Sequence, residues 1–152
     1  MEARMNHPAM VLPDAMPALQ AVGASVGQGG LAPLTIELVN MRASQINGCA
    51  VCLEGHARHA KADGETDERL AVVAGWRDAP FFTEAERAAL ALTEAVTRLS
   101  DRTDPVPDEI WDEVGRHYNE KGAAALVLAI ANINVWNRLN VTPRQQAGAH
   151  KW

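Results

Sequence analysis

The two cysteines of the chain are separated by two residues, in the order Cys49-Ala50-Val51-Cys52. On a helix, side chains three positions apart face the same way, with Cβ atoms about 5–6 Å apart. The two sulfurs can therefore form a disulfide after a small adjustment. If a helix begins at this pair, its unpaired N–H groups and its dipole stabilise a thiolate, the form that attacks peroxides and disulfides. The pair is therefore a candidate redox centre.

Two further side chains could move protons at this centre. His56 follows Cys52 by four positions, so its imidazole lies on the same helical face and can accept or return the thiol proton. Glu37 belongs to the preceding helical segment, among apolar residues. If the two helices pack antiparallel, its carboxylate can meet His56 and Cys52 and complete a proton relay. The same periodicity is equally compatible with a Glu37 that faces solvent.

A CxxC pair can also bind zinc, and free cysteines are often just small buried residues. Cys49, Cys52, His56 and His59 are each possible zinc ligands. They lie on one predicted helix over about 15 Å of rise, however, so one tetrahedral ion cannot reach all four. We therefore predict a dithiol centre without a metal, and His59 as a solvated helix residue. No glycine-rich phosphate loop is present, and no organic cofactor is expected.

Helices must position these residues, and almost the whole chain shows helical periodicity. One helix is predicted from Pro33 to Ile46, before the break at Asn47 and Gly48. The next begins near Cys49 and runs to residue 63. Further helices are predicted over residues 14–26, 66–74, 83–100, 108–118 and 120–139. The predicted fold is all-α, a single domain over residues 1–152 with its core over residues 14–141 and terminal segments that extend from it.

The helix predicted over residues 120–139 is apolar on nearly all sides, which is typical of a central core helix or a subunit contact. Residues 143–152 are predicted to form an extended tail whose terminal Trp152 is frayed or docks on a neighbouring subunit. Three tryptophans are predicted to pack in the core or an interface: Trp76, Trp111 and Trp136. Three histidines are predicted to lie on the surface: His7, His117 and His150.

Composition sets the broad class of the protein. The 152 residues are 47 % hydrophobic and 22 % charged, which is normal for a globular domain. The net charge is −5 and no basic stripe is present, so nucleic acid is not an expected partner. The longest apolar stretch, residues 122–131, is too short to cross a bilayer, and residues 1–10 lack a secretory apolar region. We expect a cytoplasmic protein without a membrane partner, where a reactive or metal-binding cysteine pair is favoured over a structural disulfide.

The segment from Glu37 to His56 resembles the core of the AhpD-like alkylhydroperoxidases, in the carboxymuconolactone decarboxylase superfamily. The family pattern is a Glu, eleven residues, CxxC, three residues and a His, and this chain matches it at every position. Trp76-Arg77 and residues 81–91 and 130–139 also look like the family. The resemblance covers about residues 14–141.

The resemblance implies an AhpD-like helical bundle, assembled as trimers or as hexamers built from dimers. Cys52 would correspond to the peroxidatic cysteine, Cys49 to the resolving one, and Glu37 and His56 to the proton relay. The implied activity is the reduction of alkyl hydroperoxides or hydrogen peroxide by an external thiol or dithiol. Val51 departs from the characterised branch, which has a His before the second Cys, so the relay would lack one member. Decarboxylase members lack the CxxC, which argues against that activity.

Position alone leaves the roles of the two sulfurs open. His56 lies nearer to Cys52, whereas the helix start favours activation of Cys49. Two other kinds of function are also compatible with the residues. One is a redox-responsive dithiol module or general disulfide reductase with little peroxidase turnover. The other is a metal-binding structural protein.

Overall fold

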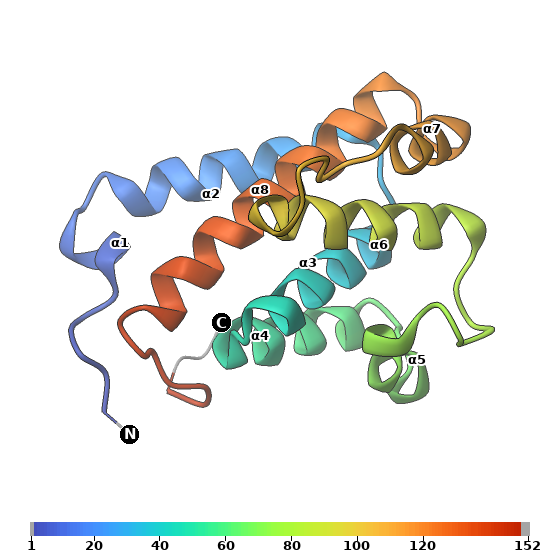
Figure 1. Cartoon of the computed structure of the whole chain (residues 1–152). Coiled ribbons are helices and arrows are strands. Elements are labelled where there is room, and N and C mark those ends of the chain that lie inside the picture. Colours follow the sequence, from blue (N-terminus) through green and yellow to red (C-terminus); the bar gives the residue numbers. More distant parts are fainter. Residues whose placement is uncertain (1, 150–152) are drawn as a thin grey trace.

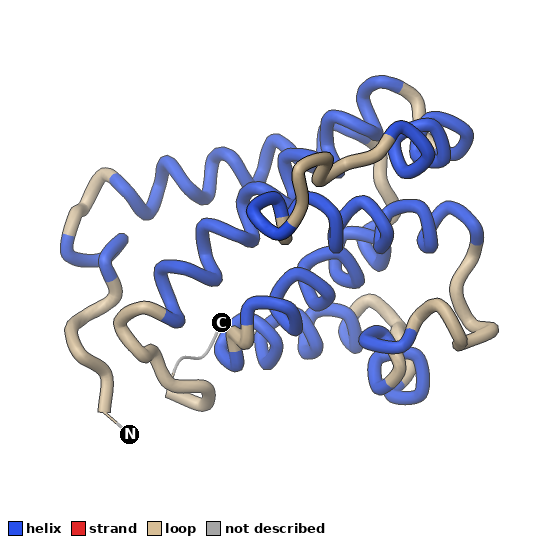
Figure 2. Tube along the Cα trace, viewed as in Figure 1, coloured by secondary structure: helices blue, strands red, loops and turns tan. Residues whose placement is uncertain are grey.

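The computed structural model describes residues 2–149, in which every regular element is a helix (Figures 1 and 2). The predicted all-α fold class is confirmed. In chain order the helices are α1 (Pro8–Val11), α2 (Ala15–Val26), α3 (Pro33–Asn47), α4 (Ala50–Ala62), α5 (Asp67–Ala71), α6 (Glu84–Thr97), α7 (Asp108–His117) and α8 (Glu120–Val141). Three short 3₁₀ turns lie between them: η1 (Gly27–Gly29), η2 (Val73–Gly75) and η3 (Leu99–Asp101).

Helix α3 lies at the centre of the bundle, because α4, α6 and α8 all pack against it (Figure 1). Its residues Leu38 and Val39 are completely enclosed. Helix α8 packs against α2, α3 and α6, and its Leu126 and Ile130 are equally enclosed. The core therefore runs along α3 and α8, and α4 packs against α3 at the edge of this core.

Local caps explain why the predicted helix starts are close to the observed ones. Thr83 caps α6 by accepting a hydrogen bond from the backbone N–H of Glu86, and the Glu86 carboxylate accepts one from the Thr83 N–H in return. Pro33 occupies the first turn of α3, where its missing N–H costs nothing. The segment predicted as one helix over residues 66–74 is shorter, because α5 gives way to the turn η2, which places Val73 in the core.

The surface position predicted for His7 is wrong. It is only 6 % exposed, and its ring centroid lies 5.8 Å from that of Trp136. Its Nδ1 accepts a hydrogen bond from the Ala9 N–H and caps α1, a short helix that was not predicted. The N-terminal segment folds across the end of α8, where the Arg4 N–H donates to the Pro143 carbonyl. This burial depends on contacts between distant parts of the chain.

The other two histidines were also predicted to lie on the surface. His117 is exposed as predicted, and His150 lies outside the described residues.

The described part of the C-terminal tail turns back and is not extended. The Gln145 N–H donates to the Asn140 carbonyl at 2.9 Å, and the Gly148 N–H donates to the Glu54 carboxylate at 2.6 Å. Glu54 lies in the second turn of α4, so the tail packs beside the start of that helix. Trp152 and the docking predicted for it lie outside the described residues.

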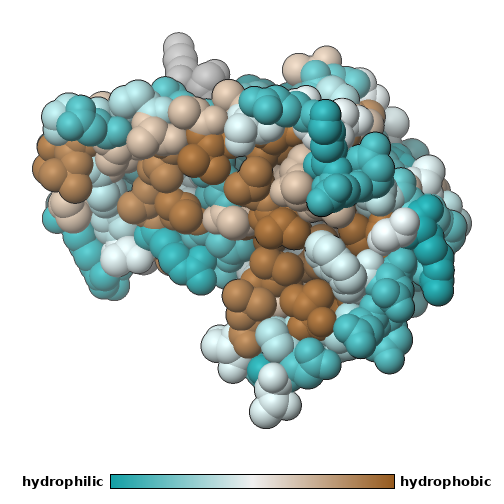
Figure 3. Space-filling view, turned by 90° about the horizontal axis from the view of Figure 1, so that it is seen from above, coloured by the Kyte–Doolittle hydropathy of each residue, from teal (hydrophilic) through white to brown (hydrophobic). Residues whose placement is uncertain are grey.

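One side of helix α8 is buried in the core, and the opposite, exposed side also carries apolar residues. Three of its large apolar residues, Val127, Leu128 and Val135, are 37–41 % exposed. Figure 3 shows apolar residues gathered over a broad area of one face of the molecule. Trp111 is 48 % exposed, so it does not pack in the core of this chain, and its place in a subunit interface stays a prediction, whereas Trp76 is buried. Within residues 2–149, no helix combines the length and apolar character needed to span a bilayer.

Glu94 on α6 holds the segment that follows α5. Its carboxylate accepts hydrogen bonds from Arg42 Nε at 2.7 Å, Trp76 Nε1 at 3.0 Å and an Arg77 guanidinium nitrogen at 2.8 Å. Burial alone would raise the pKa of Glu94. The hydrogen bonds from Trp76, Arg77 and Arg42, with the charge of Arg42, outweigh burial and hold that pKa below its usual value.

Acid is therefore expected to destabilise the fold through Glu94. The folded-state pKa is lower than the unfolded one, so the stabilisation is fully present above the unfolded pKa and is lost as pH falls through the folded pKa. At neutral pH, Glu94→Gln should lower the free energy of unfolding by about 1–3 kcal/mol. Thermal unfolding followed by circular dichroism should show a smaller loss of Tm with falling pH in Glu94→Gln than in wild type. Parallel curves for the two proteins would contradict this assignment.

Candidate active site

The chain passes from α3 to α4 through Gly48 and Cys49. Gly48 ends α3 with a φ of 67°, a left-handed conformation that glycine adopts without strain. The Cys49 N–H then donates to the Ser44 carbonyl at 3.0 Å and closes the last turn of α3. Cys49 is itself the N-cap of α4, because its Sγ accepts the backbone N–H of Cys52 at 3.3 Å. The predicted helix start at Cys49 is confirmed.

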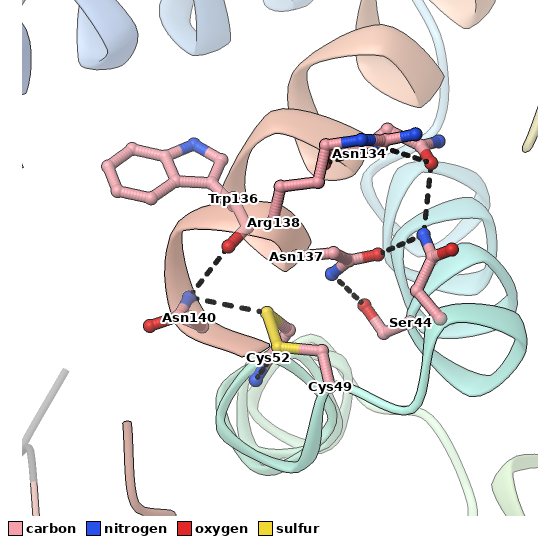
Figure 4. The surroundings of a disulfide bond; sticks show 9 residues. Ser44, Cys49, Cys52, Asn134, Trp136, Asn137, Arg138 and Asn140 are labelled. Carbon is pink, nitrogen blue, oxygen red and sulfur yellow. Dashed lines mark hydrogen bonds between the residues drawn. A yellow bond between two sulfur atoms is a disulfide. The ribbon is translucent and has the colours of Figure 1, made fainter. Parts of the chain in front are cut away.

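Cys49 and Cys52 are joined by a disulfide, with Cα atoms 5.4 Å apart (Figure 4). The bond lies at the N-terminus of α4, where unpaired N–H groups and the helix dipole stabilise negative charge on a reduced sulfur. Cys49 is 1 % exposed and Cys52 is 6 % exposed. Reagents must therefore reach the sulfurs through cavities beside them.

Two cavities flank the disulfide. The first has a volume of about 300 Å³ and is lined by Cys52 and His56 together with apolar and amide side chains, among them Met16, Ile133, Trp136, Asn40, Asn132 and Asn140. The second has a volume of about 210 Å³ and is lined by Cys49 and by residues 144–146 of the tail. Val51 and Asn140 line both. The two sulfurs therefore have separate approaches.

The hairpin of α3 and α4 brings Glu37 to His56. Glu37 Oε2 lies 2.8 Å from His56 Nδ1, and the two side chains are only 13 % and 22 % exposed. Glu37 therefore faces inward, which decides between the two orientations that periodicity had left open. A carboxylate at Nδ1 favours the tautomer with its proton there, which makes Nε2 the basic nitrogen. Since His56 lines the same cavity as Cys52, its imidazole can exchange protons with a molecule bound there.

Glu37, His56 and His59 form a possible metal-binding group. One ligand atom from each lies within 4.8 Å of the other two. This set differs from the one considered from the sequence, because the cysteines are bonded to each other and Glu37 comes from another helix. His59 is exposed as predicted, with its ring edge-on to that of His56 at 6.0 Å. A divalent cation bound here would be coordinated by both members of the Glu37–His56 pair.

Asparagines of α8 support the turn that carries Cys49, and sequence analysis missed them. Asn47, at the end of α3, donates from Nδ2 to Asn134 Oδ1 at 2.9 Å and to Asn137 Oδ1 at 2.8 Å. Asn137 Nδ2 donates in turn to Ser44 Oγ at 3.0 Å (Figure 4). These bonds fasten the end of α3 to α8 just before the disulfide.

Asn140 lies one turn further along α8, against the disulfide itself. Its Nδ2 donates to the Trp136 carbonyl at 3.0 Å and lies 3.5 Å from Cys52 Sγ (Figure 4). The sequence does carry a signal for these residues, because amides recur in an otherwise apolar helix and buried amides need partners. The amides concerned are Asn132, Asn134, Asn137 and Asn140.

Comparison with known proteins identifies the family. The model of the carboxymuconolactone decarboxylase family matches residues 13–95, which include Glu37, both cysteines and His56. The chain is also 34 % identical over 139 residues to the uncharacterised protein YdfG of Bacillus subtilis (strain 168), covering 91 % of this chain and 93 % of YdfG. The chain belongs to the carboxymuconolactone decarboxylase family. Within this family it is AhpD-like, because it matches the crystal structure described next.

A crystal structure from Agrobacterium tumefaciens, of a protein of unknown function proposed to be the antioxidant-defence protein AhpD, matches with a TM-score of 0.89. The two chains are 34 % identical, and the match covers 98 % of this chain and 100 % of that one. The debrominase Bmp8 matches with a TM-score of 0.79 at 24 % identity, over 90 % of this chain and 73 % of its own, which supports the fold alone. The predicted family and AhpD-like fold are confirmed.

In this member of the carboxymuconolactone decarboxylase family, Val51 forms part of the wall between the two cavities. It is 2 % exposed and packs in the cluster that contains both cysteines and Ile133. An apolar side chain therefore occupies the position at which the characterised AhpD branch has a histidine. Of the titratable side chains that line the Cys52 cavity, His56 is the one that hydrogen-bonds Glu37, which does not itself line the cavity.

Proposed function

We propose that this protein is a thiol-dependent peroxidase that reduces an alkyl hydroperoxide or hydrogen peroxide at Cys52. The observation that carries the proposal is the hydrogen bond between Glu37 and His56, beside a cavity that Cys52 also lines. A peroxide bound there meets a sulfur nucleophile and a proton donor together. The AhpD-like fold and the antioxidant role proposed for the Agrobacterium relative support the same activity.

The first step uses the reduced enzyme. His56 takes the proton of the Cys52 thiol, and the Glu37 carboxylate stabilises the imidazolium that forms. The thiolate then attacks the terminal oxygen of the hydroperoxide, so an S–O bond forms while the O–O bond breaks. The leaving alkoxide takes the proton from His56 and departs as an alcohol. Cys52 is left as a sulfenic acid.

The second step regenerates the disulfide. Cys49 attacks the Cys52 sulfenic acid, an S–S bond forms, and hydroxide leaves as water after protonation. An external thiol or dithiol then reduces the disulfide by thiol–disulfide exchange. Each peroxide therefore consumes one dithiol. No metal or organic cofactor takes part in this scheme.

A redox-responsive dithiol module, or a disulfide reductase with little peroxidase turnover, is the second candidate. The apolar Val51 favours it, because the proton relay then depends on His56 and Glu37 alone. The separate cavity beside Cys49 favours it as well, because a thiol partner could approach there.

We further propose that the protein is a cytoplasmic homo-oligomer, a trimer or a hexamer, with neither nucleic acid nor membrane as a partner. The exposed apolar residues of α8 support an oligomer, because a second copy packed against them would remove them from water.

The decisive experiment is a peroxidase assay with cumene hydroperoxide or hydrogen peroxide and dithiothreitol as the reductant. Wild type should exceed the double variant Cys49→Ser/Cys52→Ser by at least about 1000-fold. Equal rates in the two proteins, with a disulfide that still forms and is reduced rapidly in wild type, would support the dithiol module instead. A stoichiometric metal ion in purified wild type that is lost in Cys49→Ser would refute the peroxidase reading in favour of a metal-binding protein.

A further inference from the structure

Asn140 is a buried amide whose two ends have different surroundings. It lies in the last turn of α8 and is 3 % exposed. Its Nδ2 contacts the Trp136 carbonyl oxygen and Cys52 Sγ, as described above. Its Oδ1 is buried and accepts no hydrogen bond within the described residues. Since buried acceptors are nearly always paired, this oxygen calls for an explanation.

The neighbours of the amide fix which end points where. A backbone carbonyl oxygen only accepts hydrogen bonds, so the NH₂ end of Asn140 must face Trp136. The second hydrogen of that NH₂ group is then directed at Cys52 Sγ, and Oδ1 is left for another donor. Asn140 lines both cavities beside the disulfide, so a small donor bound in either one comes within reach of this residue.

The first cavity indicates what kind of donor this is. Asn132 also lines it, and its Oδ1 is likewise buried and has no hydrogen-bond donor among residues 2–149. Beside these two acceptors lie Met16, Ile133 and Trp136, which would contact a carbon chain. An organic hydroperoxide matches this lining, because it carries one O–H donor on an apolar body.

We propose that Asn140 is a further catalytic residue, which stabilises the Cys52 thiolate through Nδ2 and accepts the hydroxyl hydrogen of an organic hydroperoxide at Oδ1. This inference rests on the proposed peroxidase function. The hydrogen bond to Oδ1 turns the terminal oxygen toward the sulfur and the alkyl oxygen toward His56. When the O–O bond breaks, the same hydroxyl is transferred to sulfur. Asn140 Oδ1 therefore keeps one hydrogen through the step, while His56 supplies the other proton to the alkoxide.

The thiolate contact can be measured without peroxide. In the Cys49→Ser background, the rate of alkylation of Cys52 by iodoacetamide as a function of pH reports the pKa of its thiol. Asn140→Ala should raise that pKa by about one unit, because a hydrogen bond to a charged group is lost. Asn140→Asp is nearly isosteric and places an acceptor against the sulfur, so it should raise the pKa further.

The hydroperoxide contact is measured with Cys49 present. Asn140→Ala should lower kcat/KM for cumene hydroperoxide by about 10- to 100-fold, more than the smaller thiolate fraction alone explains. Asn137→Ala is the matched control, because Asn137 is a buried amide of the same helix that bonds Ser44 and Asn47 and not the sulfur. It should lower Tm and leave the pKa of Cys52 unchanged.

The outcomes separate this inference from the peroxidase proposal. An unshifted pKa in both Asn140 variants would overturn the role of Nδ2, whatever the turnover of wild type. A kcat/KM that falls only in proportion to the thiolate fraction would overturn the role of Oδ1. If the Asn140 variants shift the pKa of Cys52 but the wild-type protein reduces no peroxide, the peroxidase function and the role of Oδ1 are refuted and the thiolate contact is established.

Discussion

Cys52→Ser is expected to abolish hydroperoxide reduction, with a loss of at least about 1000-fold in kcat/KM, because a hydroxyl at this position does not ionise near neutral pH. Cys49→Ser should still react once with peroxide and stop as a sulfenic acid, because the sulfur that forms the disulfide is missing. Mass spectrometry of each variant, after one equivalent of cumene hydroperoxide and a sulfenic-acid trap, measures both results.

The same measurement decides the order of the two sulfurs. His56 shares a cavity with Cys52, whereas Cys49 caps α4 and lines the other cavity. A stable sulfenic acid on Cys49 in Cys52→Ser, with none on Cys52 in Cys49→Ser, would reverse the assignment. Circular dichroism spectra of the two variants provide the control, because both should keep the helical content of wild type.

His56→Ala is expected to lower kcat/KM by about 100- to 1000-fold, because it removes the group that moves protons to and from the reacting atoms. Glu37→Gln keeps the shape of the side chain but cannot stabilise the imidazolium, so a smaller loss of about 10- to 100-fold is expected. Steady-state kinetics with cumene hydroperoxide measure both losses. Added imidazole should partly restore His56→Ala and should leave Glu37→Gln unchanged.

His59→Ala is the matched control for the relay. His59 lines the same cavity and lies on the same helix, but no hydrogen bond joins it to Glu37. Its loss should change kcat/KM by less than about twofold. If His59→Ala is as damaging as His56→Ala and a chelator has the same effect on wild type, then the three residues act together as a divalent-cation site.

Much of this site was readable from the sequence because its signals are local. Pro33 and the pair Thr83 and Glu86 mark helix starts, and Gly48 marks a helix end, through contacts made within a few residues. The CxxC at such a boundary fixes the place of the disulfide at the start of α4. The inward orientation of Glu37 was not readable, because it depends on how α3 packs against its neighbours.

The residues that were missed depend on packing between distant segments. The last helix was predicted to end at residue 139, which left Asn140 outside it, whereas α8 continues to Val141 and carries Asn140 to the disulfide. Periodicity identifies a buried face, but it does not show that an amide on that face will meet a sulfur from α4. His7 became buried for the same kind of reason, because the N-terminal segment packs against Trp136.

The two ends of the described chain are fastened to each other beside the Cys49 cavity. The Arg4 N–H bonds the Pro143 carbonyl, and Gln145 Nε2 donates to the Met5 carbonyl at 2.9 Å. The segments that lead to the two termini therefore pass beside the cavity through which we propose that a reducing thiol reaches Cys49. Kinetic comparisons of reductants should use untagged protein, since a tag there could change the apparent preference for bulky over small dithiols without altering any residue of the site.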